Sequence, residues 1–350
     1  MTLPISTPAL LLDLDVVESN IARMAKFFEK GPTRLRPHYK NHKCPALAQR
    51  QLAAGSIGIT CATLGEADAL VANGIAHILI ANEIAGEVKI RHFVELSRKA
   101  DVIVAVDNPR VVEELAAAAR SQEVAPQVVV DVDVGQARCG VQPGEPALAL
   151  ARRAIQAGLR FRGLMGYEGH VGHLKPGPEK ERAAHAAMDK VVKTRCLLEG
   201  QGIPVEIVSA GGTGTYSLSG RFLGVTEIQS GSYLIMDTGY RTVCTDFDMA
   251  LSVLGTVISK AGEERFIVDV GLKSISAERG LPVLKCIEGA RLRKLNAEHG
   301  IIDILDPRLP VEVGDQVEIW AHYSDATINL HERMYGLRNG AVEEVLRIEG

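Results

Sequence analysis

The chain has 350 residues, too many for one minimal domain, and its length suits a β/α barrel of roughly 250 residues with one smaller unit. With 46% hydrophobic and 23% charged residues, the composition is that of a globular protein and excludes a disordered one. The net charge is −4 and no basic stripe is present, so we expect no nucleic-acid partner.

No signal for a membrane or for secretion stands out in the sequence. No apolar run is long enough to span a bilayer, and the N-terminal segment lacks a basic region followed by an apolar core. We therefore expect a cytoplasmic protein without a membrane partner. The six cysteines are widely spread and form no C-x-x-C pair, which predicts reduced thiols.

The predicted elements begin with a strand-like segment, Ala9 to Asp15, and a helix, Val16 to Lys30. Up to about residue 236, short β-branched runs then alternate with longer Ala-, Leu-, Glu- and Arg-rich stretches, as in repeated βα units. The predicted strands are Thr33 to His38, Ser56 to Ala62, His77 to Ala81, Val102 to Val106, Gln127 to Val134, Gly163 to Tyr167, Val205 to Ser209 and Glu227 to Ile235. Helices between them are predicted at Pro45 to Ala54, Leu64 to Asn73, Pro109 to Ser121, Pro146 to Ala157 and Glu179 to Gly200.

Eight βα units indicate a closed parallel barrel. An open doubly wound sheet would require a G-x-G-x-x-G turn after its first strand, and the sequence has none there. After Asp237 strand-like runs punctuated by Gly and Pro predict an all-β domain, at Ala250 to Ser259, Arg265 to Val270, Glu312 to Ala321 and Val342 to Ile348. We expect the N-terminal strand to pair there, so that residues 16–237 form the barrel and residues 1–15 with 238–350 form the β domain.

Polar residues gather at the ends of the predicted barrel strands, where barrel enzymes place their chemistry. The first strand ends in the cationic and imidazole cluster Arg36-Pro37-His38-Tyr39-Lys40-Asn41-His42-Lys43. The seventh is followed by Ser209-Ala210-Gly211-Gly212-Thr213-Gly214-Thr215, and Ser230-Gly231-Ser232-Tyr233 falls in the eighth. Glycines let backbone N–H groups converge on phosphate oxygens, and the Thr213 and Ser232 hydroxyls add donors.

A lysine facing a phosphate cup across the barrel suits pyridoxal 5′-phosphate (PLP), because a primary amine forms an exchangeable imine with its aldehyde. Taken singly, each feature is as easily a solvated charge cluster or a turn. The combination predicts an α/β fold in which a PLP-binding (β/α)8 (TIM) barrel is joined to a C-terminal all-β domain that also takes the N-terminal strand.

At this point the sequence resembles a known family over almost its whole length: the fold-type III PLP enzymes with alanine racemase-like barrels, and within them the D-threonine aldolase and D-serine dehydratase group. The lysine cluster above is its most specific motif. The others are Thr7-Pro8-Ala9 with Asp13-Leu14-Asp15 and Asn20, Asp133-Val134-Gly135-Gln136-Ala137-Arg138-Cys139-Gly140-Val141, Tyr167-Glu168-Gly169-His170, Ser209-Ala210-Gly211-Gly212-Thr213, Glu298-His299-Gly300, and His322-Tyr323-Ser324-Asp325 before Thr327-Ile328-Asn329-Leu330.

The resemblance implies roles for individual residues. Lys40 would carry the Schiff base, with Arg138 and Tyr167 beside the cofactor ring. The phosphate would be held at Ser209, Gly211, Gly212, Thr213, Gly231, Ser232 and Tyr233. His173 corresponds to the catalytic base of the aldolases, an imidazole having a suitable pKa, and His170 is the competing candidate.

The resemblance also implies a divalent metal ion, held by His322 and Asp325. The family usually leaves one residue between its two ligands, whereas Tyr323 and Ser324 both intervene here, so Asp325 is the safer assignment. Histidine, carboxylate and water ligands suit Mn²⁺ or Mg²⁺, whereas a thiolate would favour Zn²⁺. Asp325 in place of a cysteine favours the aldolase over the dehydratase.

The implied reaction is retro-aldol cleavage of a D-β-hydroxy-α-amino acid, such as D-threonine, to glycine and an aldehyde. A D-3-hydroxyaspartate aldolase, and a D-serine or 3-hydroxyaspartate dehydratase yielding a 2-oxo acid and ammonia, remain alternatives within the family. A substrate carboxylate would need a free cation, for which Arg279, Arg241 and Arg338 are candidates. Family members often pair two barrels, so we expect a homodimer.

Three other classes are weighed against this interpretation. An amino-acid racemase of the same fold would need no metal and would take a tyrosine from its partner subunit. A PLP homeostasis protein has no second domain, against which the region after Asp237 argues. A metal-dependent barrel hydrolase built on His38, His42, His170 and His173 would lack the absorbance band at about 420 nm that PLP linked to a lysine gives.

Overall fold

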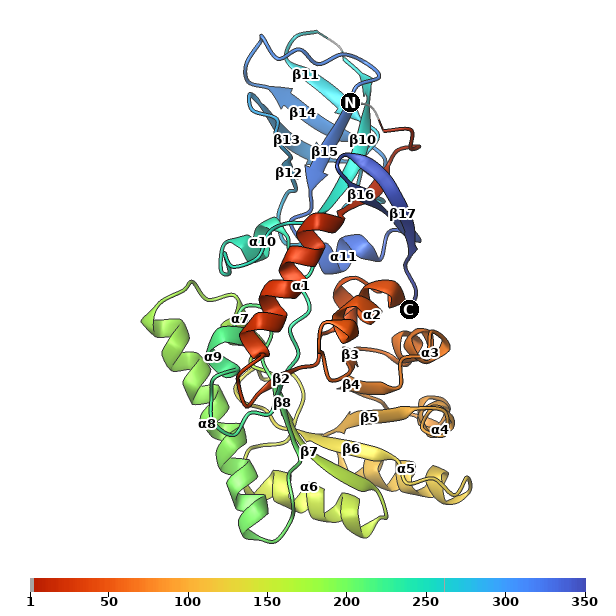
Figure 1. The fold of residues 1–350 in the computed structure, drawn as a ribbon, viewed down its shortest axis with the longest axis vertical. Coiled ribbons are helices and arrows are strands. Elements are labelled where there is room, and N and C mark those ends of the chain that lie inside the picture. The colour runs from red at the N-terminus through yellow and green to blue at the C-terminus, as the bar shows by residue number, and fades with distance from the viewer. Residues whose placement is uncertain (1–2, 261) are drawn as a thin grey trace. The chain divides into compact units, whose positions relative to one another are not determined.

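The computed structural model describes residues 3–260 and 262–350. The chain divides into two compact units, and Figure 1 follows the chain through both by colour. One unit comprises the chain up to Arg23, the short segment Asn41–Cys44 and Ser232–Glu349, and the other comprises Met24–Lys40 and Pro45–Gly231. Among the described helices, none is long and apolar enough to cross a membrane.

The second of these units is built on eight parallel strands. They are β2 (Arg34–Leu35), β3 (Ile59–Cys61), β4 (His77–Glu83), β5 (Asp101–Val106), β6 (Gln127–Asp131), β7 (Arg160–Gly166), β8 (Ile207–Ala210) and β9 (Glu227–Ile228). They pair in the order β2-β9-β8-β7-β6-β5-β4-β3. A parallel bridge from His38 to Thr60 joins the two ends of this order, and the Thr60 amide donates to the Pro37 carbonyl at 2.8 Å. The predicted closed barrel and its eight strands are confirmed.

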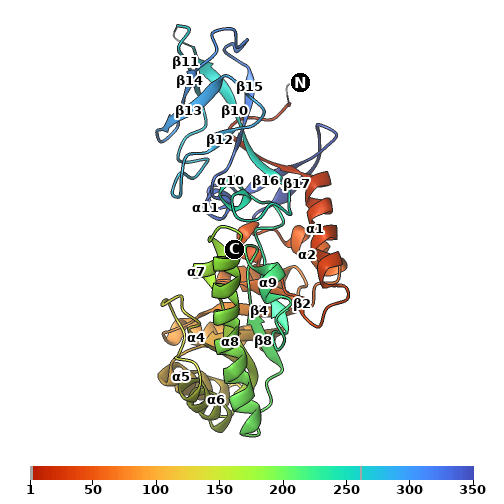
Figure 2. The same ribbon diagram turned by 90° about the vertical axis from the view of Figure 1, so that its left-hand side faces the viewer.

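Helices lie outside the barrel strands, as Figures 1 and 2 show for α3 to α6 and α8. The helices of this unit are α2 (Pro45–Ala53), α3 (Leu64–Ala72), α4 (Glu87–Leu96), α5 (Pro109–Arg120), α6 (Glu145–Gln156), α7 (Gly169–Gly172), α8 (Pro178–Gly200) and α9 (Tyr216–Ser219), preceded by α1 (Leu14–Phe28). Several begin at side-chain caps. The Thr63 hydroxyl accepts from the Glu66 amide at the start of α3, and Asn108 caps α5 just before Pro109.

Apolar side chains fill the inside of the barrel and fix its strand ends. Leu79, Ile103, Ala105, Val129, Met165 and Ile207, from five neighbouring strands, form one buried cluster. At the seam between β2 and β9 a buried ion pair adds to this core, because Arg36 binds both carboxylate oxygens of Glu227 at 3.0 Å. The polar strand ends therefore project from a packed, water-excluding interior.

The other unit is a mostly antiparallel β structure. Its strands are β1 (Ala9–Asp13), β10 (Leu251–Ser259), β11 (Arg265–Val268), β12 (Val283–Leu284), β13 (Ala290–Leu295), β14 (Gly300–Ile304), β15 (Gln316–Trp320), β16 (Arg333–Arg338) and β17 (Ala341–Arg347). β1 pairs antiparallel with β10 and parallel with β16, which confirms that the N-terminal strand belongs to this sheet.

Two short helices interrupt the strands of this unit, so it is not purely β. They are α10 (Thr238–Arg241) and α11 (Ser324–Ile328). The Asp237 carboxylate caps α10 by accepting from the Tyr240 amide at 2.7 Å. Asp325 lies in the first turn of α11, beyond the end of the predicted strand Glu312 to Ala321.

Candidate active site

Lys40 lies five residues beyond the end of β2, in a single 3₁₀ turn formed by Tyr39–Asn41. The Lys40 amide donates to His38 Nδ1 at 3.3 Å, and the His38 amide donates to the Ser230 carbonyl at 3.1 Å. A Cβ added at Gly231 would lie 2.7 Å from the His38 carbonyl oxygen, so only glycine fits there. The segment after β9 therefore runs tightly along the segment that carries the lysine.

The hydroxyl of Ser230 is a buried polar group without a hydrogen-bond partner among the described residues. The side chain is fully buried. Such an unmet group costs about 1–3 kcal/mol, which points to a ligand rather than to packing. Because β9 ends at Ile228, the predicted phosphate residues Ser230 to Tyr233 follow the strand instead of lying within it.

The glycine-rich segment after β8 has glycines where larger residues would clash. Gly211 has a φ of +73°, and a Cβ added at Gly212 would lie 3.2 Å from the Tyr167 ring. A Cβ at Gly214 would collide with the Gly172 carbonyl. Thr213, between them, is buried. The segment thus has the small residues and tight path that a phosphate cradle requires.

Glu168 shapes this segment from the end of β7. Its fully buried carboxylate accepts hydrogen bonds from the Gly211 amide at 3.0 Å, the Thr215 hydroxyl at 2.6 Å and the Ser219 hydroxyl at 2.5 Å. No role was predicted for Glu168, although its place beside Tyr167 is a signal that could have been used. The Ser209 hydroxyl, expected at the cofactor, accepts from the Gln229 side chain at 2.9 Å.

Arg138 and Tyr167 are brought together, as expected for residues that flank one ring. The Arg138 guanidinium lies 5.9 Å from the centroid of the Tyr167 ring. The loop that carries Arg138 is held by the Asp133 carboxylate, which accepts from the Ala137 amide at 3.0 Å and the Gly135 amide at 2.9 Å. These backbone hydrogen bonds, that of Ala137 first, lower the pKa of Asp133.

The two candidate bases lie close in sequence but in different settings. A Cβ added at Gly135 would meet the His170 ring at 3.2 Å and the Lys190 ammonium at 3.4 Å, so His170 packs beside the Arg138 loop. His173 ends α7 and its side chain is exposed. Both histidines therefore remain candidates for the base.

Acidic groups cluster at the ends of β4, β5 and β6. Ligand atoms of Glu83, Asp107 and Cys139 all lie within 4.8 Å of one another. Burial, followed by the nearby Glu83, raises the pKa of Asp131 to about 8, and burial with Glu83 raises the pKa of Cys139 to about 11. At neutral pH the Asp131 carboxyl therefore keeps a proton that an isolated carboxyl group would have lost.

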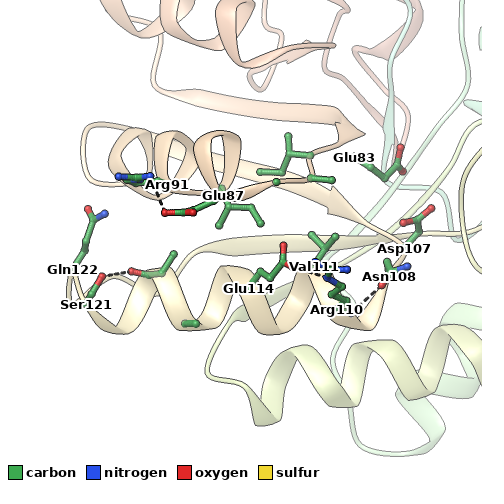
Figure 3. Close-up of a pocket in the computed structure, with 16 residues that line it drawn as sticks. Glu83, Glu87, Arg91, Asp107, Asn108, Arg110, Val111, Glu114, Ser121 and Gln122 are labelled. Carbon is green, nitrogen blue, oxygen red and sulfur yellow. Dashed lines mark hydrogen bonds and ion pairs between the residues drawn. The ribbon is translucent and has the colours of Figure 1, made fainter.

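A groove adjoining this cluster is separate from the predicted cofactor residues. It has a volume of about 1020 Å³ and runs between α4 and α5. Figure 3 shows Glu83 and Asp107 at one end and Ser121 and Gln122 at the other. Because it runs between two helices and none of the predicted cofactor residues is among the residues that line it, we do not assign it to the cofactor.

In the β unit, His322 and Asp325 are each held by a second polar group. Thr238 Oγ1 lies 2.7 Å from His322 Nδ1, which leaves Nε2 as the nitrogen for a metal ion. A Cβ at Gly280 would lie 2.8 Å from that Nε2, so glycine leaves room beside it. Asp325 Oδ1 accepts from the Asn41 side chain at 2.6 Å. Such outer contacts are typical of metal ligands.

Asp237 supports the start of α11. Its Oδ2 accepts from the amide and the hydroxyl of Ser324, both at 2.9 Å. Burial first, and the Asp325 charge in addition, raise the pKa of Asp237.

The residues present fit both implied groups. A half-buried primary amine, an unpartnered buried hydroxyl and a glycine-lined loop suit a phosphorylated aldehyde, and one imidazole with one carboxylate suits a hard divalent ion. Asn41, Glu168 and Thr238 were not predicted as site residues, and Ser230 was predicted only as part of the segment Ser230 to Tyr233.

Comparison with known proteins shows which family the chain resembles. The family model for the alanine racemase N-terminal domain matches residues 12–239, and a serine dehydratase domain model matches residues 250–337. The chain is 36% identical to a D-threonine aldolase of Arthrobacter sp. over 98% of this chain and 92% of that one. It is 33% identical to a 3-hydroxy-D-aspartate aldolase of Paracoccus denitrificans (strain Pd 1222), over 97% and 91% respectively.

Solved structures agree. The D-threonine aldolase of Filomicrobium marinum superimposes with a TM-score of 0.95 at 34% identity, over 98% of this chain and 95% of that one. The D-threo-3-hydroxyaspartate dehydratase of Delftia sp. HT23 gives 0.91 at 31% identity, over 99% and 98%.

The chain therefore belongs to the alanine racemase-like family of PLP-dependent barrel enzymes. Within that family it belongs to the group of lyases that contains the D-threonine aldolases and the hydroxyaspartate aldolases and dehydratases. The family resemblance read from the sequence is confirmed.

Proposed function

We propose that this protein cleaves a D-β-hydroxy-α-amino acid of the D-threonine type to glycine and an aldehyde. The observation that carries the proposal is Lys40, a half-buried amine at the end of the first barrel strand, in a chain 36% identical to a D-threonine aldolase. Bound PLP would supply the electron withdrawal that lets the Cα–Cβ bond break.

The proposed roles of the residues follow their surroundings. Lys40 holds the cofactor and exchanges it with the substrate amine. Ser230, with its unpartnered hydroxyl, and the glycine-rich segment around Thr213 hold the phosphate. Arg138 and Tyr167 flank the ring. Gly231, Ser232 and Tyr233 complete the phosphate site.

The metal site is proposed at His322 and Asp325, with Mn²⁺ or Mg²⁺ as the ion. A divalent ion lowers the pKa of a coordinated hydroxyl group, so the substrate hydroxyl would lose its proton more readily. His173 is the proposed acceptor of that proton and His170 the alternative. We also propose a homodimer, as the family resemblance suggests, and a cytoplasmic location.

A second candidate substrate is D-3-hydroxyaspartate, and one contact favours it. Of the three candidate arginines, Arg338 binds Asp15, Glu18 and Glu343, and Arg241 binds the Phe247 carbonyl and Asp248. The Arg279 guanidinium lies 4.2 Å from the centroid of the ring of Tyr323. Tyr323 follows the proposed metal ligand His322 in the chain, and this position is what favours Arg279 among the three. A cation there could receive a substrate carboxylate.

The test is to incubate the pure protein with PLP, Mn²⁺ and D-threonine or D-3-hydroxyaspartate and to identify the products. Glycine with an aldehyde supports the aldolase, and a 2-oxo acid with ammonia shows the dehydratase. L-threonine is the stereochemical control.

Borohydride reduction should attach the cofactor covalently to the peptide that contains Lys40. Lys40→Ala should abolish both the label and turnover, whereas Lys26→Ala, on α1, should change neither. A label on another lysine would refute the assignment.

A further inference from the structure

Asn41 follows Lys40 directly and lies in the same 3₁₀ turn, yet its side chain contacts the proposed metal ligand. The side chain is fully buried. Its Nδ2 donates to Asp325 Oδ1 at 2.6 Å and to Ser324 Oγ at 2.9 Å. Its Oδ1 is also buried, and among the described residues no donor reaches it.

The hydrogen-bond pattern fixes which atom of the amide is the oxygen. The Ser324 hydroxyl donates to Asp237 Oδ2 at 2.9 Å, so towards Asn41 it can only accept. Asp325 is the second acceptor. If the amide were turned over, its carbonyl oxygen would face the Asp325 carboxylate and a lone pair of Ser324 Oγ, and both contacts would be repulsive. The observed orientation therefore uses both Nδ2 protons, one for each acceptor. Oδ1 is left as the acceptor without a donor among the described residues.

A buried, unmet carbonyl oxygen beside a carboxylate suits a cation. The Oδ1 and Nδ2 atoms share one planar amide, so Oδ1 lies near the Asp325 carboxylate that Nδ2 contacts. Amide carbonyl oxygens are ligands of hard divalent ions, in the same class as carboxylates and water.

We propose that Asn41 Oδ1 is a third protein ligand of the divalent ion, together with Asp325 and His322. This inference rests on the metal site of the proposed function. It adds a role for Nδ2, which holds the Asp325 carboxylate in place for the same ion. Since Asn41 follows Lys40 in one turn, metal binding would also restrain the backbone of the cofactor lysine.

Manganese binding to the full-length PLP-loaded protein tests this without measuring turnover. Free Mn²⁺ gives an electron paramagnetic resonance signal that is lost on binding, so a titration yields the dissociation constant. Asn41→Ala removes both the oxygen and the support of Asp325, and should weaken Mn²⁺ binding roughly 10- to 100-fold.

Asn41→Asp separates a ligand from a support. An aspartate keeps an oxygen at the Oδ1 position but replaces the donor to Asp325 by a second negative charge. If Oδ1 binds the ion, Asn41→Asp retains or exceeds the wild-type Mn²⁺ affinity. If Asn41 only supports Asp325, the two carboxylates repel and Asn41→Asp binds as weakly as Asn41→Ala, which overturns the proposal.

Asn20 provides a matched control in the same unit. It is equally buried, but its side chain is fully satisfied, by the Leu234 and Asp248 carbonyls and by the Asp248 amide. Asn20→Ala should lower stability and leave Mn²⁺ affinity unchanged. A loss of affinity equal to that of Asn41→Ala would show a general folding effect and overturn the inference.

Asp325→Ala distinguishes this inference from the proposed function. If Asp325→Ala binds Mn²⁺ as the wild type does, the metal site itself is misplaced and both fail. If Asp325→Ala weakens binding while Asn41→Ala does not, only the role of Asn41 is refuted.

Discussion

The carboxylate of Glu168 accepts a hydrogen bond from the amide of Gly211 at 3.0 Å, and so ties the end of β7 to the glycine-rich segment after β8. The same carboxylate holds Thr215 and Ser219, so a single buried anion sets the path of this segment. That amide is consequently committed to Glu168. Glu168 therefore contributes to the proposed phosphate site by setting the path of the glycine-rich segment. It does not add a backbone amide that could bind the phosphate.

Replacing Glu168 should therefore weaken cofactor binding. Glu168→Ala would leave three buried donors unsatisfied, at a cost of about 1–3 kcal/mol each if they find no other partner. We expect a lower free energy of unfolding in urea and a higher PLP dissociation constant, read from absorbance at about 420 nm. Glu168→Gln, which keeps the shape, should recover part of both, and the exposed Glu179→Ala should change neither. Unchanged PLP affinity in Glu168→Ala would contradict this role.

The buried pair Arg36–Glu227 should dominate the stability of the barrel seam. Glu227→Gln leaves a buried guanidinium without its counter-charge, which typically costs 3–5 kcal/mol, so about that loss is expected in urea unfolding. An Arg36→Met/Glu227→Leu double variant should recover most of it. The surface ion pair Arg110–Glu114 on α5 is the comparison. Glu114→Ala should lower the free energy of unfolding by less than about 1 kcal/mol. Equal losses for the two glutamates would show that burial of the pair is unimportant.

Asp325 should be required for metal-dependent turnover. Asp325→Ala should lose activity that excess Mn²⁺ partly restores, because one ligand and its charge are missing but other ligands remain. EDTA should inhibit the wild type, and added Mn²⁺ should reverse the inhibition. Asp306→Ala, a half-buried aspartate paired with the nearby Arg308, is the control. Full activity of Asp325→Ala without added metal would refute the metal assignment.

Protonation of the acidic cluster should make stability fall as the pH rises. The pKa of Asp131 is raised from 3.8 to about 8, so between these values the folded protein binds a proton that the unfolded chain does not. The stabilisation is complete below the lower value and is lost as the pH passes through the upper one. Between these two pH values the free energy of unfolding should fall by up to about 1.4 kcal/mol per pH unit, the slope for one proton.

Asp131→Asn should flatten this dependence, and the exposed Glu145→Gln should not. Urea unfolding of the cofactor-free protein at several pH values between 5 and 9 measures it. An identical slope in wild type and Asp131→Asn would place the titrating proton elsewhere.

The barrel could be predicted because its strands bury β-branched runs whose pattern is local. The same reasoning overestimated strands at the site: β9 has two residues, Glu227 and Ile228, whereas the predicted strand extended to Ile235. Beyond Ile228 the chain passes close to His38, whose amide donates to the Ser230 carbonyl. Helix α11 has five residues, too few to show a helical period.

The contacts that organise the site could not be read from the sequence, because they join distant residues. Asn41 and Asp325 are 284 positions apart, and Glu168 reaches Gly211 across 43. The residue types expected at the site were identified, whereas their supporting groups were not. A pattern along the chain records which face is buried and does not record which buried polar groups find each other.

Strand β1 lies between β10 and β16 in the sheet order, so the first strand to be synthesised has both neighbours near the other end of the chain. During synthesis on the ribosome, β1 cannot form its two strand pairings until first β10 and then β16 have been synthesised. If synthesis stops after β10 and before β16, one edge of β1 has unpaired backbone N–H and C=O groups and can aggregate with other chains. Chaperone demand during biosynthesis should accordingly be greatest in that interval.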